Sequence, residues 1–518
     1  MEIIEKIRKL IENSCKKLFP EKIRLLDQVS IEKSSKKEHG DYTANLRGFS
    51  PKEQEILVLD IKKSSEFKKY FSEIKFEKPV FVNFFLSSSY LLGNLKEILK
   101  QKEKFGELKI GKGEKINLEF VSANPTGPLT LGNGRGGFCG DILANILNKA
   151  GFKVKKEYYI NDTGEQIRKL GHSIIGNSQA VYKGKYIKDL RKKIKGEDPE
   201  EVGKKAAKII LEKMIKPSVK TAGIQFDVWF SEKTLSGDIN KALDYLKAKN
   251  LAYEKEGALW FKSSSMGDEK DRVLIKADGE KTYIASDIAY LKNKFERGFD
   301  RLIYIWGADH YGYINRLKAG VQALGFNKEK VDIIIMQLIR LFEKGQEVRM
   351  SKRTGIYVTL DELIDEVGLD AARFFFMTKN PTTHLDFDMS LAKEKSDKNP
   401  VYYIQYAHAR ICSILKKIEN KISYDNFESF KDSSELELIK ELIRFPEVIK
   451  NTAGDYQIQR IPQYATNLAS LFHQFYARCR VISKDKKITK ARIALILATK
   501  IVLKNTLDLM GISAPEKM

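Results

Sequence analysis

A polar, glycine-containing stretch at residues 122–137 has residue types that could bind a phosphorylated ligand. Four glycines lie in its second half: Gly132, Gly134, Gly136 and Gly137. Glycine lets a ligand approach the backbone closely, and a helix that starts nearby offers unpaired N–H groups and the positive end of its dipole. Thr130 and Asn133 add side-chain donors. The predicted chemistry is the binding of an anion and the stabilisation of charge that develops on it.

Two elements flank this stretch and would position it. Residues 116–121 form a short apolar run with β-branched and aromatic residues, which is typical of a buried strand. Residues 141–147 carry apolar residues at helical spacing. The expected order is therefore strand, glycine loop and helix. Further strands are expected at residues 152–160 and 302–306, and their alternation with helices indicates a parallel sheet with crossover helices.

Shifts in composition divide this multidomain α/β chain into three expected domains. Residues 1–110 mix helical and strand patterns, which predicts an α+β domain. Residues 111–392 hold the parallel sheet, interrupted at about residues 168–250 by a charged helical insertion with strand character only at residues 225–229. Residues 393–518 are helical throughout, which predicts an all-α bundle.

A second candidate for phosphate chemistry is the basic segment EVRMSKRTG at residues 347–355. Alone, such a charge run is usually a solvated turn. Together with Thr130-Leu131-Gly132-Asn133, however, it makes the chain resemble class I aminoacyl-tRNA synthetases, whose HIGH and KMSK signatures correspond to that tetrapeptide and to Arg349-Met350-Ser351-Lys352. Both histidines of HIGH are replaced, by Thr130 and Asn133, which donate hydrogen bonds but cannot become cationic.

The chain is more specifically similar to the arginyl-tRNA synthetase family, whose patterns match in order along the whole length. The matching segments are NLEFVSANPTGP, YYINDTGEQI, DGEKTYIASDIAY, WGADHYGYI, NPVYYIQYAHARI and GISAPEKM. The resemblance implies a Rossmann-like catalytic domain, an N-terminal domain that contacts tRNA and an anticodon-binding bundle. It also implies ATP-dependent activation of L-arginine to arginyl-adenylate, with release of pyrophosphate, followed by transfer to the 3′ end of tRNA(Arg). ATP is then a substrate, with Mg²⁺ as its companion.

The resemblance also assigns site residues. The catalytic residues it implies are Thr130, Asn133 and Lys352. The arginine pocket it implies consists of Glu119, Asn124, Tyr283, Asp287 and His310. The ATP site it implies consists of Pro128, Thr130, Gly132, Asn133, Gly307, Asp309, His310, Met350, Ser351 and Lys352. The tRNA contacts it implies are His39, Asp41, Tyr403, Tyr406, Arg410 and Met518.

The chemistry of arginine supports this pocket. A guanidinium is a planar cationic fork, so its site should supply carboxylates that accept two parallel hydrogen bonds. Glu119 and Asn124 follow the first strand, at the usual ligand edge of an open α/β sheet. Tyr283 and Asp287 are four residues apart and share one face of an expected helix. Each residue alone could equally be a helix cap, a surface ion pair or a packed tyrosine.

Two alternatives remain open. The motif GxGxxG is formally present, with Glu157 where a dinucleotide fold places its ribose-binding acid. However, Pro125 and Pro128 separate the strand from the first glycine, so a Rossmann dehydrogenase is the less favoured reading. The other alternative is a synthetase-like RNA-binding protein that lost its chemistry through Thr130 and Asn133.

The composition of the chain indicates which kinds of partner and cellular location to expect. The 518 residues carry a net charge of +23, which favours a polyanionic partner such as nucleic acid. A general compositional bias would also produce this charge, because most of the basic residues are lysines scattered through helices together with glutamates. Four widely spaced cysteines, without a CxxC motif or clustered histidines, indicate neither a disulfide framework nor a zinc site, and no metal ligands are expected. With no apolar run of membrane-spanning length and no signal-like N-terminus, we expect a cytoplasmic protein that does not bind membranes. A monomer is expected, although no residue pattern in the sequence determines the oligomeric state.

Overall fold

The computed structural model describes residues 3–34, 36–348, 358–417, 430 and 432–518. Its contacts divide the chain into two compact units, each assembled from separate segments. The first unit consists of Met1–Phe105, Arg410–Glu447 and Leu468–Leu503. The second unit consists of Gly106–Ala409, Val448–Asn467 and Lys504–Met518.

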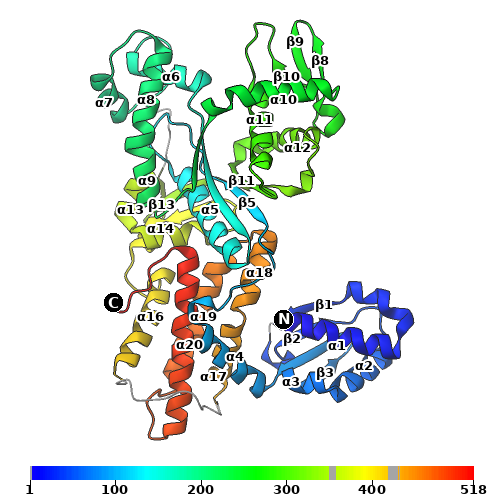
Figure 1. The fold of residues 1–518 in the computed structure, drawn as a ribbon. Helices are drawn as coiled ribbons and strands as arrows, with labels where there is room; N and C mark the ends of the chain where they lie inside the picture. Colours follow the sequence, from blue (N-terminus) through cyan, green and yellow to red (C-terminus); the bar gives the residue numbers. More distant parts are fainter. Residues whose placement is uncertain (1–2, 35, 349–357, 418–429, 431) are drawn as a thin grey trace. The chain divides into compact units, whose positions relative to one another are not determined.

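The second unit is built on a five-stranded parallel sheet (Figure 1). Across the sheet the strands are β12 (Val331–Met336), β11 (Arg301–Gly307), β5 (Lys115–Glu119), β6 (Lys153–Ile160) and β7 (Val228–Ser231). All neighbouring strands run parallel, as the sequence predicted. The chain adds strands outward from β5 through β7 and then crosses to β11, so the strand order reverses between β5 and β11. Ligands of open parallel sheets bind outside the carboxyl ends of the strands at such a reversal.

The edge strand β7 lies inside the range expected to be a helical insertion, yet it pairs with β6 in the central sheet. The helices before it are α6 (Gly164–Ile175), α7 (Lys185–Lys193), α8 (Pro199–Ile210) and α9 (Lys216–Thr221). The chain therefore leaves the sheet after β6, forms these helices and returns to the sheet edge at β7.

Helices cover both faces of the sheet. On one face, α5 (Leu131–Lys149) packs against β5, β6 and β11. On the other, α11 (Tyr283–Glu296) and α12 (Ile314–Ala323) share an apolar core with β11, the helix α10 (Ser236–Ala248) and a small antiparallel sheet. That sheet is formed by β8 (Ala252–Lys255), β9 (Ala258–Phe261) and β10 (Arg272–Ile275). The side chains that alternate along β5 therefore point to α5 or to α11.

The glycines expected in a loop belong to helix α5, which begins at Leu131, so the prediction of a glycine loop is wrong. Two of them allow close packing, because a Cβ atom at Gly134 would lie 2.5 Å from Leu360 and one at Gly137 would lie 2.8 Å from Ile224. The next glycine of the helix, Gly140, does the same, because a Cβ atom there would lie 2.2 Å from the Phe120 ring. Gly132, in contrast, is exposed and lines a cavity. The loop that precedes the helix instead spans residues 120–130.

Helix α5 also carries a fully buried arginine. The Arg135 guanidinium donates three hydrogen bonds to backbone oxygens, to Gln337 at 2.8 Å, Asn380 at 3.1 Å and Thr383 at 2.8 Å. Burial lowers its pKa to about 10, so it stays protonated at neutral pH. Arg135 thereby ties the start of α5 to the segment after β12 and to the segment before β15 (Leu385–Asp388).

The second unit continues with further helices and strands. They are β13 (Ile339–Glu343), β14 (Gln346–Val348), α13 (Leu360–Val367), α14 (Leu369–Phe376) and α15 (Met389–Lys393). The long C-terminal helices contribute residues to both units: α16 (Pro400–Lys416), α18 (Phe445–Asp455), α19 (Arg460–Arg478) and α20 (Lys486–Met510). None of the described helices is long and apolar enough to cross a bilayer.

The first unit contains a four-stranded antiparallel sheet in the order β1 (Ser30–Lys33), β2 (Tyr42–Asn45), β4 (Phe81–Leu86) and β3 (Phe71–Glu77). Its helices are α1 (Ile3–Leu18), α2 (Pro51–Lys63), α3 (Ser65–Tyr70), α4 (Ser88–Gln101) and α17 (Ser433–Ile443). A capping box fixes the start of α2, because Ser50 and Glu53 satisfy each other's backbone N–H groups. This α+β arrangement agrees with the prediction for the N-terminal residues.

Candidate active site

A cavity of about 1530 Å³ opens where β5 and β11 end. Its walls come from the β5–α5 loop, the end of β11, the start of α11 and the segment between α6 and α7. All five residues expected to bind arginine line it: Glu119, Asn124, Tyr283, Asp287 and His310. The described residues expected to bind ATP line it as well: Pro128, Thr130, Gly132, Asn133, Gly307, Asp309 and His310. Met350, Ser351 and Lys352 lie outside the described residues.

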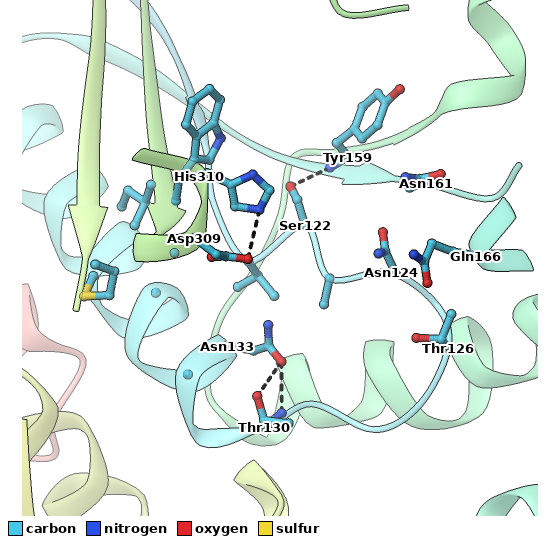
Figure 2. Close-up of a pocket in the computed structure, with 18 of the residues that line it drawn as sticks. Ser122, Asn124, Thr126, Thr130, Asn133, Tyr159, Asn161, Gln166, Asp309 and His310 are labelled. Carbon is cyan, nitrogen blue, oxygen red and sulfur yellow. Dashed lines mark hydrogen bonds and ion pairs between the residues drawn. The ribbon is translucent and has the colours of Figure 1, made fainter. Parts of the chain in front are cut away.

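At the start of α5, Thr130 fixes the orientation of the Asn133 amide (Figure 2). The backbone N–H and the hydroxyl of Thr130 both donate to Asn133 Oδ1, at 3.0 and 2.9 Å. The amide oxygen is thus occupied, and the amide nitrogen points away from Thr130 into the cavity. The Asn133 amide nitrogen and the first N–H groups of helix α5 therefore lie close together, and all of them can donate hydrogen bonds to an anion.

Three buried or partly buried carboxylates face the same cavity from three elements. Glu119 ends β5, Asp287 lies on α11, and Glu232 follows β7. Burial, together with the negative charges of Glu232 and Glu119, raises the pKa of Asp287 to about 7, although the Tyr313 hydroxyl donates to it. Burial also raises the pKa of Glu232, which accepts a hydrogen bond from Thr163 at 3.0 Å.

This clustering of acids identifies the kind of ligand that the cavity can take. Like charges held close together in a poorly hydrated site disfavour each other's ionised form. A cation placed between them removes that penalty, and a planar cation with several N–H donors can satisfy more than one carboxylate at once. The cavity therefore combines hydrogen-bond donors at the start of α5 with a group of carboxylates around Asp287.

The cavity mouth carries aromatic and imidazole groups. Tyr283 is 53% exposed, one helical turn before Asp287 on α11. The His310 ring lies 5.9 Å from the Trp306 ring, and its Nε2 is 3.7 Å from Asp309 Oδ2 (Figure 2). These flat groups near the end of β11 could hold the ring system of a nucleotide.

Two lining residues, Glu232 and Tyr313, were missed by the sequence analysis. Glu232 directly follows β7, as Glu119 ends β5, so the rule that ligands bind at the carboxyl ends of strands could have found it. Tyr313 stands in the quoted segment WGADHYGYI, but only the folded chain brings its hydroxyl to Asp287.

None of the residues expected to contact tRNA is among those that line this cavity. In the first unit, His39 Nδ1 is 2.6 Å from Glu77, and Asp41 accepts hydrogen bonds from Leu86 N–H at 2.8 Å and contacts Lys440 at 2.7 Å. The remaining four are distributed along the helical C-terminal region: Tyr403, Tyr406, Arg410 and Met518. The Tyr406 ring stacks on Tyr402 at 6.5 Å, the Arg410 guanidinium lies 5.4 Å from the Tyr476 ring, and Met518 is 51% exposed.

Within the described part of the chain, no group of three or more His, Cys, Asp or Glu side chains is placed to hold a metal ion. The four cysteines, all within the described segments, are buried and form no disulfide.

Comparison with known proteins gives three matching family models. The model for the catalytic domain of class I (R) tRNA synthetases matches residues 177–413, that for the arginyl tRNA synthetase N terminal domain matches residues 5–86, and that for the DALR anticodon binding domain matches residues 404–518. The arginine–tRNA ligase of Caldanaerobacter subterraneus subsp. tengcongensis is 43% identical over 95% of this chain and 94% of its own. That of Acetivibrio thermocellus is 40% identical over the full length of both chains. The solved arginyl-tRNA synthetase of Thermus thermophilus matches the fold with a TM-score of 0.77 at 20% identity, covering both chains completely.

Proposed function

The chain belongs to the arginyl-tRNA synthetase family and ligates arginine to tRNA with ATP, and we propose that both steps take place in the cavity between β5 and β11. The observation that carries this proposal is the presence, in one cavity, of an anion site at the start of α5 and a group of carboxylates at Asp287. In the first step, the substrate carboxylate attacks the α-phosphate of ATP and pyrophosphate leaves. The chain's residues position the substrates and stabilise charge, so no protein nucleophile is needed.

On the nucleotide side, we propose that the Asn133 amide nitrogen and the first N–H groups of α5 donate to phosphate oxygens. Gly132 leaves room for this approach, because it lines the cavity without a side chain. The described residues do not form a metal site of their own, and we propose that Mg²⁺ arrives as a complex with ATP. This ion keeps several waters and is commonly held by substrate phosphates with one or two carboxylates. Asp309 lines the cavity, is exposed and belongs to the expected ATP site, so we propose that it is the carboxylate nearest to this ion.

On the amino-acid side, we propose that Asp287 accepts a hydrogen-bonded pair from the guanidinium of arginine. Glu119 and Asn124 offer further oxygens from the end of β5 and the following loop, and Tyr283 covers the mouth. An uncharged side chain would leave these buried acceptors unpaired, which discriminates by roughly 10⁴-fold or more and makes a separate editing domain unnecessary.

The binding of arginine should depend on pH through Asp287. Its pKa is about 7 before a cation binds, whereas a guanidinium requires the ionised form. Below pH 7 Asp287 is mainly protonated and must lose a proton on binding, so affinity falls as the pH falls. Above pH 8 it is already ionised and affinity levels off. We expect the Kd for arginine, measured by calorimetry, to decrease about tenfold from pH 6 to pH 8.

The Asp287→Asn variant provides the control for this pH dependence, because its amide does not titrate. Its weaker arginine Kd should change far less over the same range. A wild-type Kd that is constant between pH 6 and pH 8 would contradict the assignment of Asp287.

We further propose that Lys352 acts on the phosphates, as the family resemblance implies. Lys352→Ala should lower kcat about 10²-fold and leave the KM for arginine nearly unchanged, as for a contact made mainly in the transition state. The measurement is tRNA-dependent exchange of pyrophosphate into ATP. A rise in arginine KM that accounts for the whole loss would contradict this role.

We propose that the outer tRNA contacts involve His39 and Asp41 in the N-terminal region and the face of α16 that carries Tyr403, Tyr406 and Arg410. Tyrosine and arginine on one helix face are suited to stacking on unpaired bases. Asp41 accepts a hydrogen bond from Leu86 N–H and pairs with Lys440, so its side chain is held in one position before tRNA binds. We also propose the three domains at residues 1–110, 111–392 and 393–518, and a cytoplasmic monomer.

The decisive experiment is aminoacylation of total tRNA with each of the twenty amino acids. We expect arginine alone to be attached to tRNA, and the reaction to require ATP. Attachment of another amino acid, or none, would contradict the proposal. The absence of any ligation together with retained tRNA binding would favour the non-catalytic RNA-binding alternative.

A further inference from the structure

Behind the arginine site lies a lysine that none of the proposed contacts uses. Lys294, on α11, is completely buried and does not line the cavity. Its Nζ lies 2.6 Å from Glu119 Oε2 and 3.9 Å from Glu157 Oε1. Glu157 is already bound by both terminal nitrogens of Arg297, at 2.6 and 2.9 Å. Glu119 is therefore the carboxylate whose charge Lys294 balances.

Two aromatic rings hold the Lys294 ammonium in place. Its Nζ lies 4.3 Å from the centre of the Tyr290 ring and 4.2 Å from that of Tyr304. Such contacts stabilise a cation and restrict where it can move. Tyr283, Asp287, Tyr290 and Lys294 are spaced by four, three and four residues, so one face of α11 leads from the cavity mouth to this buried ammonium.

Glu119 separates this fixed ammonium from the cavity. One carboxylate oxygen, Oε2, accepts from Lys294, and the other accepts from Ser122 Oγ at 3.3 Å. Glu119 thus reaches the cavity as half of a neutral ion pair, whereas Asp287 has no lysine or arginine within ion-pair distance among the described residues. Arg316 also lines the cavity and its charge acts on Asp287, but the nearest carboxylate to Arg316 as an ion-pair partner is that of Asp268. A substrate cation at Asp287 therefore meets a carboxylate that forms no ion pair of its own, but one at Glu119 meets a carboxylate that already has its cation.

We propose that Lys294 is a specificity-determining positioning residue, which holds Glu119 in a neutral pair so that the cavity admits a guanidinium and rejects a primary ammonium such as that of lysine. This inference rests on the proposed arginine site and adds the class of amino acid that the site excludes.

The rejection follows from the different shapes of the two cations. An ammonium is a compact charge that needs close carboxylate contact, and a second ammonium at Glu119 would share one carboxylate with Lys294, so the like charges repel. A guanidinium spreads its charge over a planar fork, so it can bind Asp287 with two N–H groups while another N–H points to Glu119. Building repulsion against the competitor is an established route to specificity.

Lys294→Met tests the proposal, because it keeps the apolar stem and removes the ammonium. We expect the ratio of arginine to lysine kcat/KM, measured by tRNA-dependent pyrophosphate exchange, to fall about 10²-fold. The kcat/KM for lysine itself should rise about tenfold, which general damage to the fold would not produce. Lys294→Gln, which can still donate a hydrogen bond to Glu119 without a charge, should show the same rise. Lys292→Met, which removes a surface ion pair with Glu296 on the same helix, is the matched control and should leave the ratio unchanged.

Equal losses for arginine and lysine in folded Lys294 variants, checked by circular dichroism and melting temperature, would overturn the proposal. The wild-type protein offers a test that does not depend on the variants folding. Agmatine and cadaverine differ mainly in carrying a guanidinium or an ammonium, and we expect only agmatine to compete with arginine. Inhibition by cadaverine of equal strength would also overturn the proposal. A wild-type protein that fails to use arginine would instead refute the proposed function.

Discussion

Asp287→Asn is expected to raise the KM for arginine about 10³-fold, because it leaves the guanidinium without its buried counter-charge. The substitution keeps the shape of the side chain, and the amide oxygen can still accept the hydrogen bond from the Tyr313 hydroxyl. It also removes the repulsion with Glu119 and Glu232 that raises the pKa of Asp287, so the empty variant should fold at least as stably. Steady-state aminoacylation with varied arginine measures the effect.

The matched control is Asp278→Asn, in the exposed turn before α11. Asp278 accepts a hydrogen bond from Glu280 N–H at 2.9 Å, and an asparagine there can do the same. The control should leave the KM for arginine at the wild-type value. A wild-type KM in the Asp287→Asn variant would remove Asp287 from the arginine site, and with it the main support for the cation side of the cavity.

Asn133→Asp should lower kcat/KM for ATP about 10³-fold, because it replaces a phosphate donor with a negative charge that faces the triphosphate. The two side chains have the same shape. The carboxylate would still accept both hydrogen bonds from Thr130, so the start of α5 should be preserved. Pyrophosphate exchange with varied ATP measures the loss, and the melting temperature without ATP tests the fold.

The same substitution at the other end of the helix serves as its control. Asn148 is exposed near the C-terminus of α5, and its Oδ1 accepts from Val154 N–H at 3.1 Å. Asn148→Asp keeps that acceptor and should leave the kinetics with ATP unchanged. If Asn133→Asp behaved like this control, the start of α5 would not be where the phosphates bind.

Strands and helices whose apolar residues follow a regular spacing could be predicted from the sequence. The runs at residues 116–121, 152–160 and 302–306 are strands β5, β6 and β11, and the spacing of Tyr283 and Asp287 places both on the first turns of α11. The predictions of β5 and β11 succeeded because both are buried runs that are mostly apolar, and that of α11 because helical faces recur every three to four residues. In β6 the first residues are mostly charged, and the buried part lies at its carboxyl end.

The errors and omissions concern contacts between distant segments. The glycines of α5 were expected in a loop, since glycine lowers helix propensity, yet Gly134 and Gly137 are required by Leu360 and Ile224, which no local pattern reveals. Lys294 was overlooked although it lies seven residues after Asp287 on the same helical face. Its partner Glu119 is 175 residues away, so the pair becomes visible only when β5 and α11 are brought together.

The contacts of Arg135 determine which substitutions around helix α5 would disturb the position of that helix. The three partners of Arg135 are main-chain oxygens, and every amino acid carries such an oxygen. Substitutions at positions 337, 380 and 383 would therefore leave the bonds to Arg135 intact, whereas a shorter or unforked side chain at position 135 would lose them. Because the start of α5 is held by backbone oxygens, its placement depends on the path of these segments and not on the side chains that they carry.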